Sequence, residues 1–320
     1  MNRLWTLLAS LLLLAPATAQ VLTVGPLGSG ANFTEIQPAV DAAVPGDTVL
    51  VAPGTYASFV LTKSVDVLGP IAGDALVVGL AEEVSAIAIR NLPPGQDVVV
   101  SGFHVQSGPT CCIPTTVFGE VCQCTPVVQI EDCRGTVTLT SIAVDGPDGT
   151  RALPLDVKNS SRLLLMGCTL LGEDQIVGYT TSALQALNSR LIISSSVLMG
   201  GSGIFSVIGN TGQVAMELAG CNVELANSMV IGGNEGTWKN LGGPVPGVVY
   251  HSYGSPAIQA EASTLLLKGG PNGLIRAGGG ACDGACQQLS PGVLLTLGSE
   301  VIAMGDLAVE GGGDPSENSS

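Results

Sequence analysis

The chain has 320 residues, with 11 Lys and Arg against 26 Asp and Glu and a formal net charge of −15 at pH 7. This excess of acid excludes nucleic acid and anionic membrane surfaces as partners, and it predicts weak binding of polyanions unless Ca²⁺ bridges the two. Apolar residues make up 46% of the chain and aromatic residues 3%, so the composition excludes a disordered chain and favours stacked short strands over a globule built around large rings.

Residues 1–20 have the form of a secretory signal peptide. Arg3 supplies a positive charge, Leu7–Leu14 forms an apolar run, and Ala17-Thr18-Ala19 forms a small-residue cleavage site before Gln20. The apolar run is too short to span a bilayer, and Gly and Pro interrupt every later one, so we expect no transmembrane segment. The sequence therefore predicts a secreted or cell-surface protein.

A short amphipathic helix is expected after residue 34. Thr34-Glu-Ile-Gln37 has the form of a capping box, with Thr34 as N-cap and Gln37 at the third helical position. Apolar residues then follow at helical spacing until Pro45-Gly46 ends the helix. We expect this helix to cap the N-terminal end of a stack of strands, because strand edges there would otherwise stay unpaired.

The segment from residue 21 to residue 69 also carries a family resemblance. It contains Gly28-Ser-Gly-Ala-Asn-Phe-Thr-Glu-Ile-Gln37 and Pro45-Gly-Asp-Thr-Val-Leu-Val-Ala-Pro-Gly-Thr-Tyr56. It resembles the first segment of right-handed parallel β-helix (pectin lyase-like) proteins, and most closely that of pectin methylesterases. The catalytic segments of that family, Gln-Asp-Thr-Leu, Asp-Phe-Ile-Phe-Gly and Leu-Gly-Arg-Pro-Trp, do not occur in this sequence. The resemblance therefore implies the fold but not the esterase activity.

An internal repeat begins at Val98, and it predicts a solenoid independently of the first segment. Each unit has three short apolar runs separated by small polar turns, and it ends in glycine. The intervals between these glycines are 26, 28 and 32 residues, which is enough for three short strands and their turns. The glycines that end successive units are Gly146, Gly172, Gly200 and Gly232.

Each unit is expected to form one coil that stacks about 4.8 Å above the previous one. Such stacking would place Leu165, Ile193 and Leu225 in one buried ladder. The sequence therefore predicts an all-β fold, a single-stranded right-handed parallel β-helix of about eight or nine rungs over residues 21–310. Residues 311–320 are polar and rich in glycine, which predicts a disordered tail.

The repeat intervals lengthen because loops are inserted after the third apolar run of a unit. Insertions in a solenoid usually fall on one face, which is often the binding face. The long insertions are expected near 109–126, 233–256 and 271–291.

All nine cysteines follow the signal segment, which fits an oxidising compartment and loops that are stapled by disulfides. Zinc is the alternative for the five cysteines between Cys111 and Cys133, but no histidine lies nearer to them than His104. The odd number leaves at least one free thiol, which we expect at Cys168 or Cys221. The expected disulfide partners lie among Cys111, Cys112, Cys122, Cys124 and Cys133, and Cys282 is expected to pair with Cys286.

Acidic residues in two successive turns form the first candidate site. Asp145 and Asp148 lie in one turn, and Glu173 and Asp174 lie in the corresponding turn of the next unit. Stacking would bring these carboxylates onto the same edge, where they could act as an acid/base pair in glycoside cleavage or as oxygen ligands of Ca²⁺. The alternative is that they solvate the edge of an acidic protein. No other cofactor is expected.

Aromatic residues in the second insertion form the other candidate site. Trp238, Tyr250, His251 and Tyr253 could stack on sugar rings, or they could pack over the last coils instead. His104 lies in an alternating apolar segment and is expected to be a rung or surface side chain rather than a ligand.

Three functions remain open on these observations. The first is a non-enzymatic structural or glycan-contacting protein whose partner is an extracellular polysaccharide or a cell-surface glycan. The second is a polysaccharide lyase or glycoside hydrolase that uses the turn carboxylates. The third is an adhesin-like structural protein without sugar binding.

Overall fold

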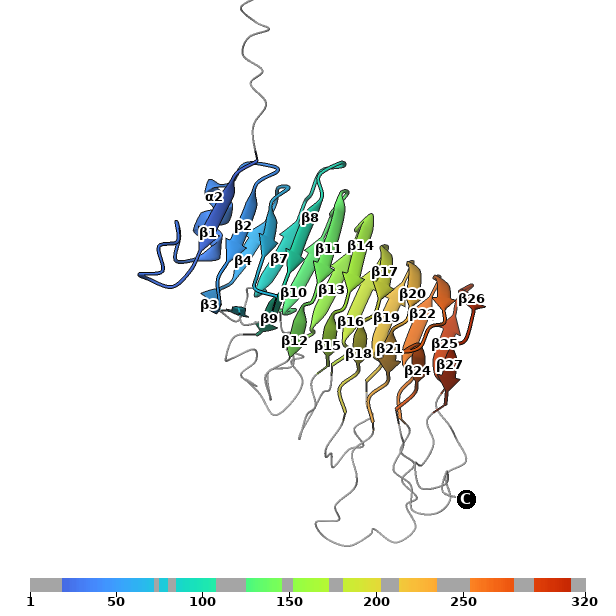
Figure 1. Cartoon of the computed structure of the whole chain (residues 1–320). Coiled ribbons are helices and arrows are strands. Elements are labelled where there is room, and N and C mark those ends of the chain that lie inside the picture. The colour runs from blue at the N-terminus through green and yellow to red at the C-terminus, as the bar shows by residue number, and fades with distance from the viewer. Residues whose placement is uncertain are drawn as a thin grey trace, which may run out of the picture.

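The computed structural model describes residues 19–71, 75–79, 85–107, 125–145, 152–172, 181–202, 213–234, 254–278 and 291–311. Within this part the chain winds through three parallel sheets of 10, 9 and 8 strands, which we call sheets A, B and C (Figure 1). It visits A, then B, then C, and returns to A one coil further on. Because the smallest sheet has 8 strands, the solenoid has eight complete coils, as the repeat predicts.

The strands are short, and each lies beside its counterparts in the neighbouring coils. Sheet A contains β1 (Val21–Val24), β2 (Thr48–Val51), β5 (Asp66–Leu68), β8 (Val98–Ser101), β11 (Thr136–Thr140), β14 (Arg162–Met166), β17 (Arg190–Ser194), β20 (Asn222–Ala226), β23 (Thr264–Lys268) and β26 (Glu300–Met304). Sheet B contains β3 (Gly54–Ala57), β6 (Ala75–Val78), β9 (Phe103–Gln106), β12 (Ala143–Asp145), β15 (Thr169–Leu171), β18 (Val197–Met199), β21 (Met229–Ile231), β24 (Leu274–Arg276) and β27 (Ala308–Glu310). Sheet C contains β4 (Phe59–Leu61), β7 (Ile87–Arg90), β10 (Val128–Glu131), β13 (Leu155–Lys158), β16 (Leu184–Leu187), β19 (Met216–Ala219), β22 (Ile258–Glu261) and β25 (Val293–Thr296).

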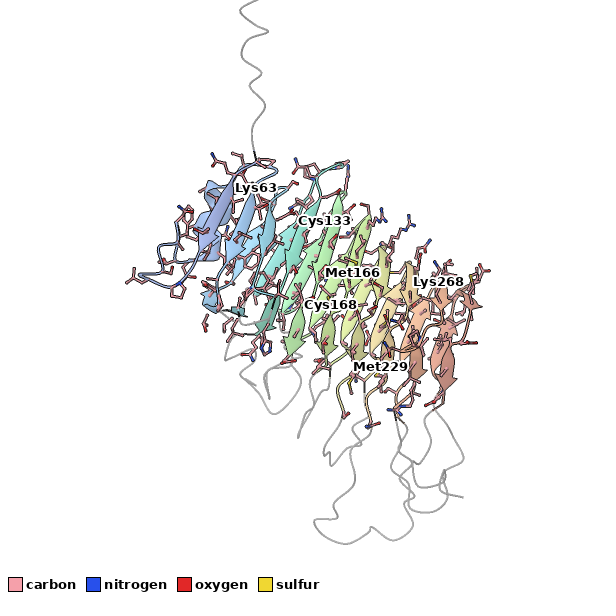
Figure 2. The ribbon with its side chains drawn as sticks, viewed as in Figure 1. Lys63, Cys133, Met166, Cys168, Met229 and Lys268 are labelled. Carbon is pink, nitrogen blue, oxygen red and sulfur yellow. The ribbon has the colours of Figure 1, made fainter. Side chains whose placement is uncertain are left out.

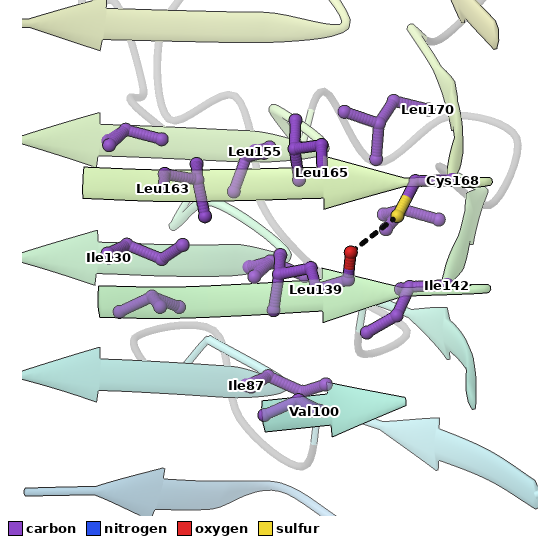
Figure 3. Packing of buried hydrophobic residues seen from close by; sticks show 14 of the residues in the cluster. Ile87, Val100, Ile130, Leu139, Ile142, Leu155, Leu163, Leu165, Cys168 and Leu170 are labelled. Carbon is purple, nitrogen blue, oxygen red and sulfur yellow. Dashed lines mark hydrogen bonds between the residues drawn. The ribbon is translucent and has the colours of Figure 1, made fainter. Parts of the chain in front are cut away.

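The core is a set of aliphatic ladders between the sheets. Leu165 pairs with Ile193, and Ile193 pairs with Leu225, so the predicted ladder is confirmed. These side chains are 0%, 0% and 2% exposed. Figure 3 shows neighbouring rungs of the same packing. Strand residues alternate between this interior and the outer faces, because successive side chains of a strand point to opposite sides.

Helix α2 (Ile36–Ala42) covers the N-terminal end of the stack and contacts β1, β2, β3 and β4 (Figure 1). The expected capping box is not formed, because Glu35 rather than Thr34 is the N-cap and no side chain caps the helix. The Gln37 side chain is used elsewhere: its Oε1 accepts a hydrogen bond from the Val60 N–H at 2.6 Å. The residue thus ties the helix to sheet C. Within the described residues, no helix has the length and apolar character that a membrane span requires.

Asparagine and aspartate side chains form a ladder at the corner where the chain passes from sheet C to sheet A. Asp132, Asn159 and Asn188 have φ angles of 53°, 50° and 48°, a conformation that Asn and Asp tolerate better than most residues. Asn159 Nδ2 donates to Asp132 Oδ1 at 3.2 Å, and Asn188 Nδ2 donates to Asn159 Oδ1 at 3.5 Å. Gly220, with φ of 63°, has the equivalent place in the next coil, so the ladder ends at Asn188.

The residue after each of these positions is a buried Ser or Cys, and this corrects one prediction. Cys133 is 0% exposed, and its sulfur lies 3.4 Å from the carbonyl oxygen of Ile89 (Figure 2). Its thiol is free, so the expectation that Cys133 joins a disulfide is wrong: the side chain fills the place in the interior that Ser160 fills one coil later. Cys168 and Cys221 are free and buried, as expected. The other cysteines, Cys111, Cys112, Cys122, Cys124, Cys282 and Cys286, lie outside the described residues.

Glycines close the corner between sheet B and sheet C, and their role explains the glycine that ends each repeat. A Cβ on Gly172 would lie 2.2 Å from the carbonyl oxygen of Thr181, and one on Gly200 would lie 2.1 Å from that of Gln213. Gly146 lies outside the described residues. The insertions predicted near 109–126 and 233–256 each follow a sheet B strand and precede a sheet C strand, so they start and finish at this corner. The range predicted near 271–291 includes the sheet B strand β24, so only its part after β24 falls at this corner. Residues 312–320 of the predicted tail also lie outside the described residues.

The C-terminal end of the stack differs from the N-terminal end. Leu295 pairs with the buried Ala260, and Val309 pairs with the buried Ile275, yet the two are 38% and 52% exposed. Their counterparts in earlier coils are almost fully buried. No helix covers this last coil in the described part of the chain.

Candidate functional site

Most of the predicted site residues lie outside the part of the chain that the structure describes. These residues are Asp148, Glu173, Asp174, Trp238, Tyr250, His251 and Tyr253. The predicted stacking of turn carboxylates and the predicted aromatic surface therefore stay predictions. Asp145 is described, and it ends β12 on the outer face of sheet B.

Asp145 forms a pair with His104, which the sequence did not reveal. The His104 Nε2 atom lies 2.7 Å from Asp145 Oδ2, and the two side chains are 36% and 40% exposed. His104 is on β9, which neighbours β12 in the sheet, so its prediction as a rung or surface side chain is confirmed. The residues are 41 positions apart in sequence, and the insertion between them hides the register.

The outer face of sheet C carries a second arrangement, which we call the polar row. Strands β10, β13, β16, β19 and β22 pair in register, and the second residue of each strand points outward. Amides and carboxylates alternate along this row, with one side chain in each coil. Its members are Gln129, Asp156, Gln185, Glu217 and Gln259.

Hydrogen bonds fix the side chains in the middle of the polar row. Lys158 Nζ lies 2.6 Å from Asp156 Oδ2, and Gln185 Nε2 donates to Glu217 Oε2 at 3.0 Å. The Ser182 hydroxyl donates to the other oxygen of Glu217. Asp156 is 6% exposed, so the lysine compensates a nearly buried charge. These contacts hold the carboxylates of Asp156 and Glu217 in place.

The ends of the polar row are held differently. At one end the Arg90 guanidinium donates to Gln129 Oε1, and Gln129 Nε2 donates to Glu131 Oε2 at 3.4 Å. At the other end Gln259 is exposed, and its side chain has no hydrogen bond to the described residues. The sequence signal was present in the repeated strands, whose second residue is polar in Val-Gln-Ile-Glu, Leu-Asp-Val-Lys and Met-Glu-Leu-Ala. The apolar residues of these runs predict the strands, but they do not show which polar residues align between coils.

The polar row offers both donors and acceptors at a constant step of about 4.8 Å, the spacing of neighbouring strands. It is poorly suited to a metal ion. The carboxylates of Asp156 and Glu217 are two coils apart, about 10 Å along the stack, whereas Ca²⁺ requires oxygen ligands at about 2.3–2.6 Å. Among the described residues, no three His, Cys, Asp or Glu side chains are grouped as metal ligands. The predicted calcium site therefore still rests on the turn acids alone.

Three parallel sheets through which one chain winds in turn define a parallel β-helix. One similar solved structure is a pectin methylesterase in complex with a hexasaccharide, with 13% identity over 78% of this chain and 80% of that chain and a TM-score of 0.40.

Two further similar structures extend the comparison. Pectin methylesterase PemA from Erwinia chrysanthemi has 10% identity over 78% of this chain and 79% of that chain, with a TM-score of 0.41. Pectate lyase Pel9A has 12% identity over 92% of this chain and 78% of that chain, also with a TM-score of 0.41. No protein-family model and no curated protein sequence matches this chain. These likenesses concern the fold alone.

Proposed function

We propose that this is an exported β-helix protein that contacts polysaccharide chains through the polar row on sheet C. The observation that carries the proposal is the in-register alternation of amide and carboxylate side chains in five successive coils. The signal-like segment at residues 1–20 supports export. A non-enzymatic glycan-contacting role follows.

The chemistry of the polar row suits sugar hydroxyl groups. A hydroxyl both donates and accepts hydrogen bonds, so it matches a surface on which carboxylate acceptors alternate with amides that do both. The step between coils is comparable to the length of one sugar ring, so successive rings of an extended chain would meet successive rungs. Because the middle of the row is held by Lys158 and Ser182, little side-chain ordering is required on binding.

The proposal is tested with Gln185→Ala combined with Gln259→Ala. Both residues are exposed, so their loss should leave the core intact. Each lost hydrogen bond costs about 0.5–1.5 kcal/mol, so we expect binding to weaken about tenfold on a glycan array and in calorimetry. The matched control, Thr138→Ala with Thr264→Ala, changes outward residues of sheet A and should bind as wild type.

Two results would contradict the proposal. One is that no neutral polysaccharide binds the wild-type chain, and the other is that the sheet C variant binds as well as the control. An arm with EDTA tests the calcium expectation, because a calcium-bridged contact would disappear when the metal is removed. Trp238→Ala with Tyr253→Ala tests the predicted aromatic surface. Absence of binding to every glycan on the array, by the wild-type chain and the variants alike, would favour an adhesin-like protein without sugar contact.

A second candidate function rests on the His104–Asp145 pair. A carboxylate that holds one ring nitrogen of a histidine orients the ring, which is the usual arrangement of a general base. A polysaccharide lyase or hydrolase is therefore the alternative. Assays for reducing ends and unsaturated products, with His104→Gln, Asp145→Asn, Asp148→Asn and Glu173→Gln, decide it. If the wild-type chain turns over a polysaccharide and these changes abolish the turnover, catalysis replaces binding as the proposed function.

A further inference from the structure

Two arginines stand side by side at the start of neighbouring strands in sheet A. Arg162 begins β14 and Arg190 begins β17, and the following residues of the two strands, Leu163 and Leu191, are paired. Both arginines are exposed. Arg134 is also exposed and lies one coil earlier, on the turn whose Cys133 carbonyl accepts the Ser161 N–H at 2.8 Å. The three guanidinium groups thus follow one edge of the solenoid.

No carboxylate of the described chain neutralises this group. The ion pairs of the described residues are His104–Asp145, Lys158–Asp156 and Lys268–Glu224, and none of them includes these arginines. The nearest outward acid on the following strand, Glu224, is held by Lys268 at 2.6 Å. Like charges on neighbouring strands repel, so an exposed arginine pair gains most from an anion placed between its members.

An open polar groove lies beside the arginines, and it contains no acidic residue. It is lined by Ser161, Asn188, Arg190 and Asn222, together with the buried Ser160, Ser189 and Cys221 and with Gly220. Gly220 opens the groove, since it interrupts the asparagine ladder and leaves no side chain there. A Cβ at Gly220 would lie 2.6 Å from Asn188 Oδ1. In a chain with 26 acids and 11 bases, a groove lined by guanidinium, amide and hydroxyl groups, with no carboxylate among its lining residues, suits an anion better than a cation.

We propose that this groove at the C-to-A corner binds an oxyanion, a sulfate or a carboxylate, carried by an otherwise neutral polysaccharide. The arginine fork matches both groups, because each presents two or more oxygen atoms in a plane or on one face. The net charge of −15 opposes a densely charged polymer, so sparse substitution is required. The site is on a different edge from the insertions and from the polar row. The inference rests on the proposed function in one respect only, namely that the anion is part of a polysaccharide.

The experiment compares three probes of one oligosaccharide: the neutral parent, a sulfated form and a form with a uronic acid. We expect one charged form to bind about tenfold more tightly than the parent at low salt, because hydrogen bonds between charged partners are roughly twice as strong as neutral ones. Arg190→Gln should remove this preference. The matched control is Arg276→Gln, which removes the same charge from an exposed position on sheet B and should retain it.

A second variant keeps every charge and fills the groove. Gly220→Asn restores the ladder residue at a positive φ angle that asparagine tolerates, and the atom that its Cβ approaches is the mobile end of the Asn188 side chain. This variant should fold, and its affinity for the charged probe should be lower than that of the wild type. Equal affinity for the three probes, or equal losses in Arg190→Gln and Arg276→Gln, would overturn the proposal.

The two proposals fail separately. If only the charged form binds and Arg190→Gln abolishes that binding, the proposed anion site is supported and the proposed glycan contact at the polar row is refuted. If Gln185→Ala with Gln259→Ala abolishes all neutral binding and the probes show no charge preference, the reverse holds. Whether the sulfated or the uronic probe gains affinity identifies the anion.

Discussion

Replacing Gly200 by alanine tests the corner between sheets B and C, because the close approach there explains why each repeat ends in glycine. The new Cβ would lie 2.1 Å from the Gln213 carbonyl oxygen, 2.9 Å from its carbon and 3.0 Å from the Gly233 nitrogen. Relief requires the backbone at Gln213 to move by about 1.4 Å, since non-bonded heavy atoms prefer about 3.5 Å or more. All three neighbours are backbone atoms, so no side-chain rotation can make room.

Such a movement strains two hydrogen bonds of the corner. Gly233 N–H donates to Gln213 O at 2.8 Å, and Gln213 N–H donates to Gly201 O at 3.0 Å. Overpacking costs about 1–3 kcal/mol and each lost hydrogen bond about 1 kcal/mol, while alanine gains about 0.4–1 kcal/mol through the unfolded chain. We therefore expect a loss of about 3 kcal/mol in the free energy of unfolding, measured by urea titration with circular dichroism.

Gly28→Ala is the control for this prediction. Gly28 has φ of +87°, and no heavy atom of the described residues lies within 4 Å of the position that the alanine methyl would take. Alanine there meets only backbone strain of about 1–2 kcal/mol. Gly172→Ala should behave like Gly200→Ala because its Cβ would meet Thr181 O at 2.2 Å. If Gly200→Ala is within about 0.5 kcal/mol of wild type, steric closure of the corner is not the reason for the glycine.

Three further changes probe the core and its titrating groups. Leu165→Ala should lower the free energy of unfolding by about 2–5 kcal/mol in urea titration, because the side chain is 0% exposed, and a smaller loss would contradict tight packing of the ladder. Burial raises the pKa of the Cys168 thiol above its ordinary value of 9.0. The contribution of the protonated thiol to the free energy of unfolding is therefore complete below 9.0 and is lost as the pH rises through the raised pKa. Cys168→Ala should make the free energy of unfolding depend less on pH in this alkaline range. Hydrogen bonds from the backbone N–H groups of Gln20 and Val44 lower the pKa of Asp47 from 3.8, so its contribution is present above that value and is lost as the pH falls through the lowered value. The free energy of unfolding of Asp47→Asn should therefore depend less on pH below 3.8, and an unchanged acid limb would show that Asp47 does not contribute.

The arrangement of the functional surfaces depended on register, which the sequence does not display. His104 and Asp145 meet because β9 and β12 pair in register, although the two residues are 41 positions apart in the sequence. The polar row likewise requires five strands from different repeats to align to the residue, since a shift of one would turn Gln185 or Glu217 inward. The same holds for Arg162 and Arg190, whose neighbourhood follows from the pairing of Leu163 with Leu191.

The sequence by itself determined the kind of fold. Apolar runs of three to five residues, small polar turns and a glycine at each repeat end can be satisfied only by stacked coils, and the N-terminal helix followed from local apolar spacing. Tertiary structure alone decided which polar side chains share a face, that Cys133 points into the core instead of forming a disulfide, and that Gln37 binds β4 rather than capping its helix. The physical reason is that hydrophobic periodicity is a local property of a strand, whereas neighbours on an outer face are set by hydrogen bonds between coils about 30 residues apart.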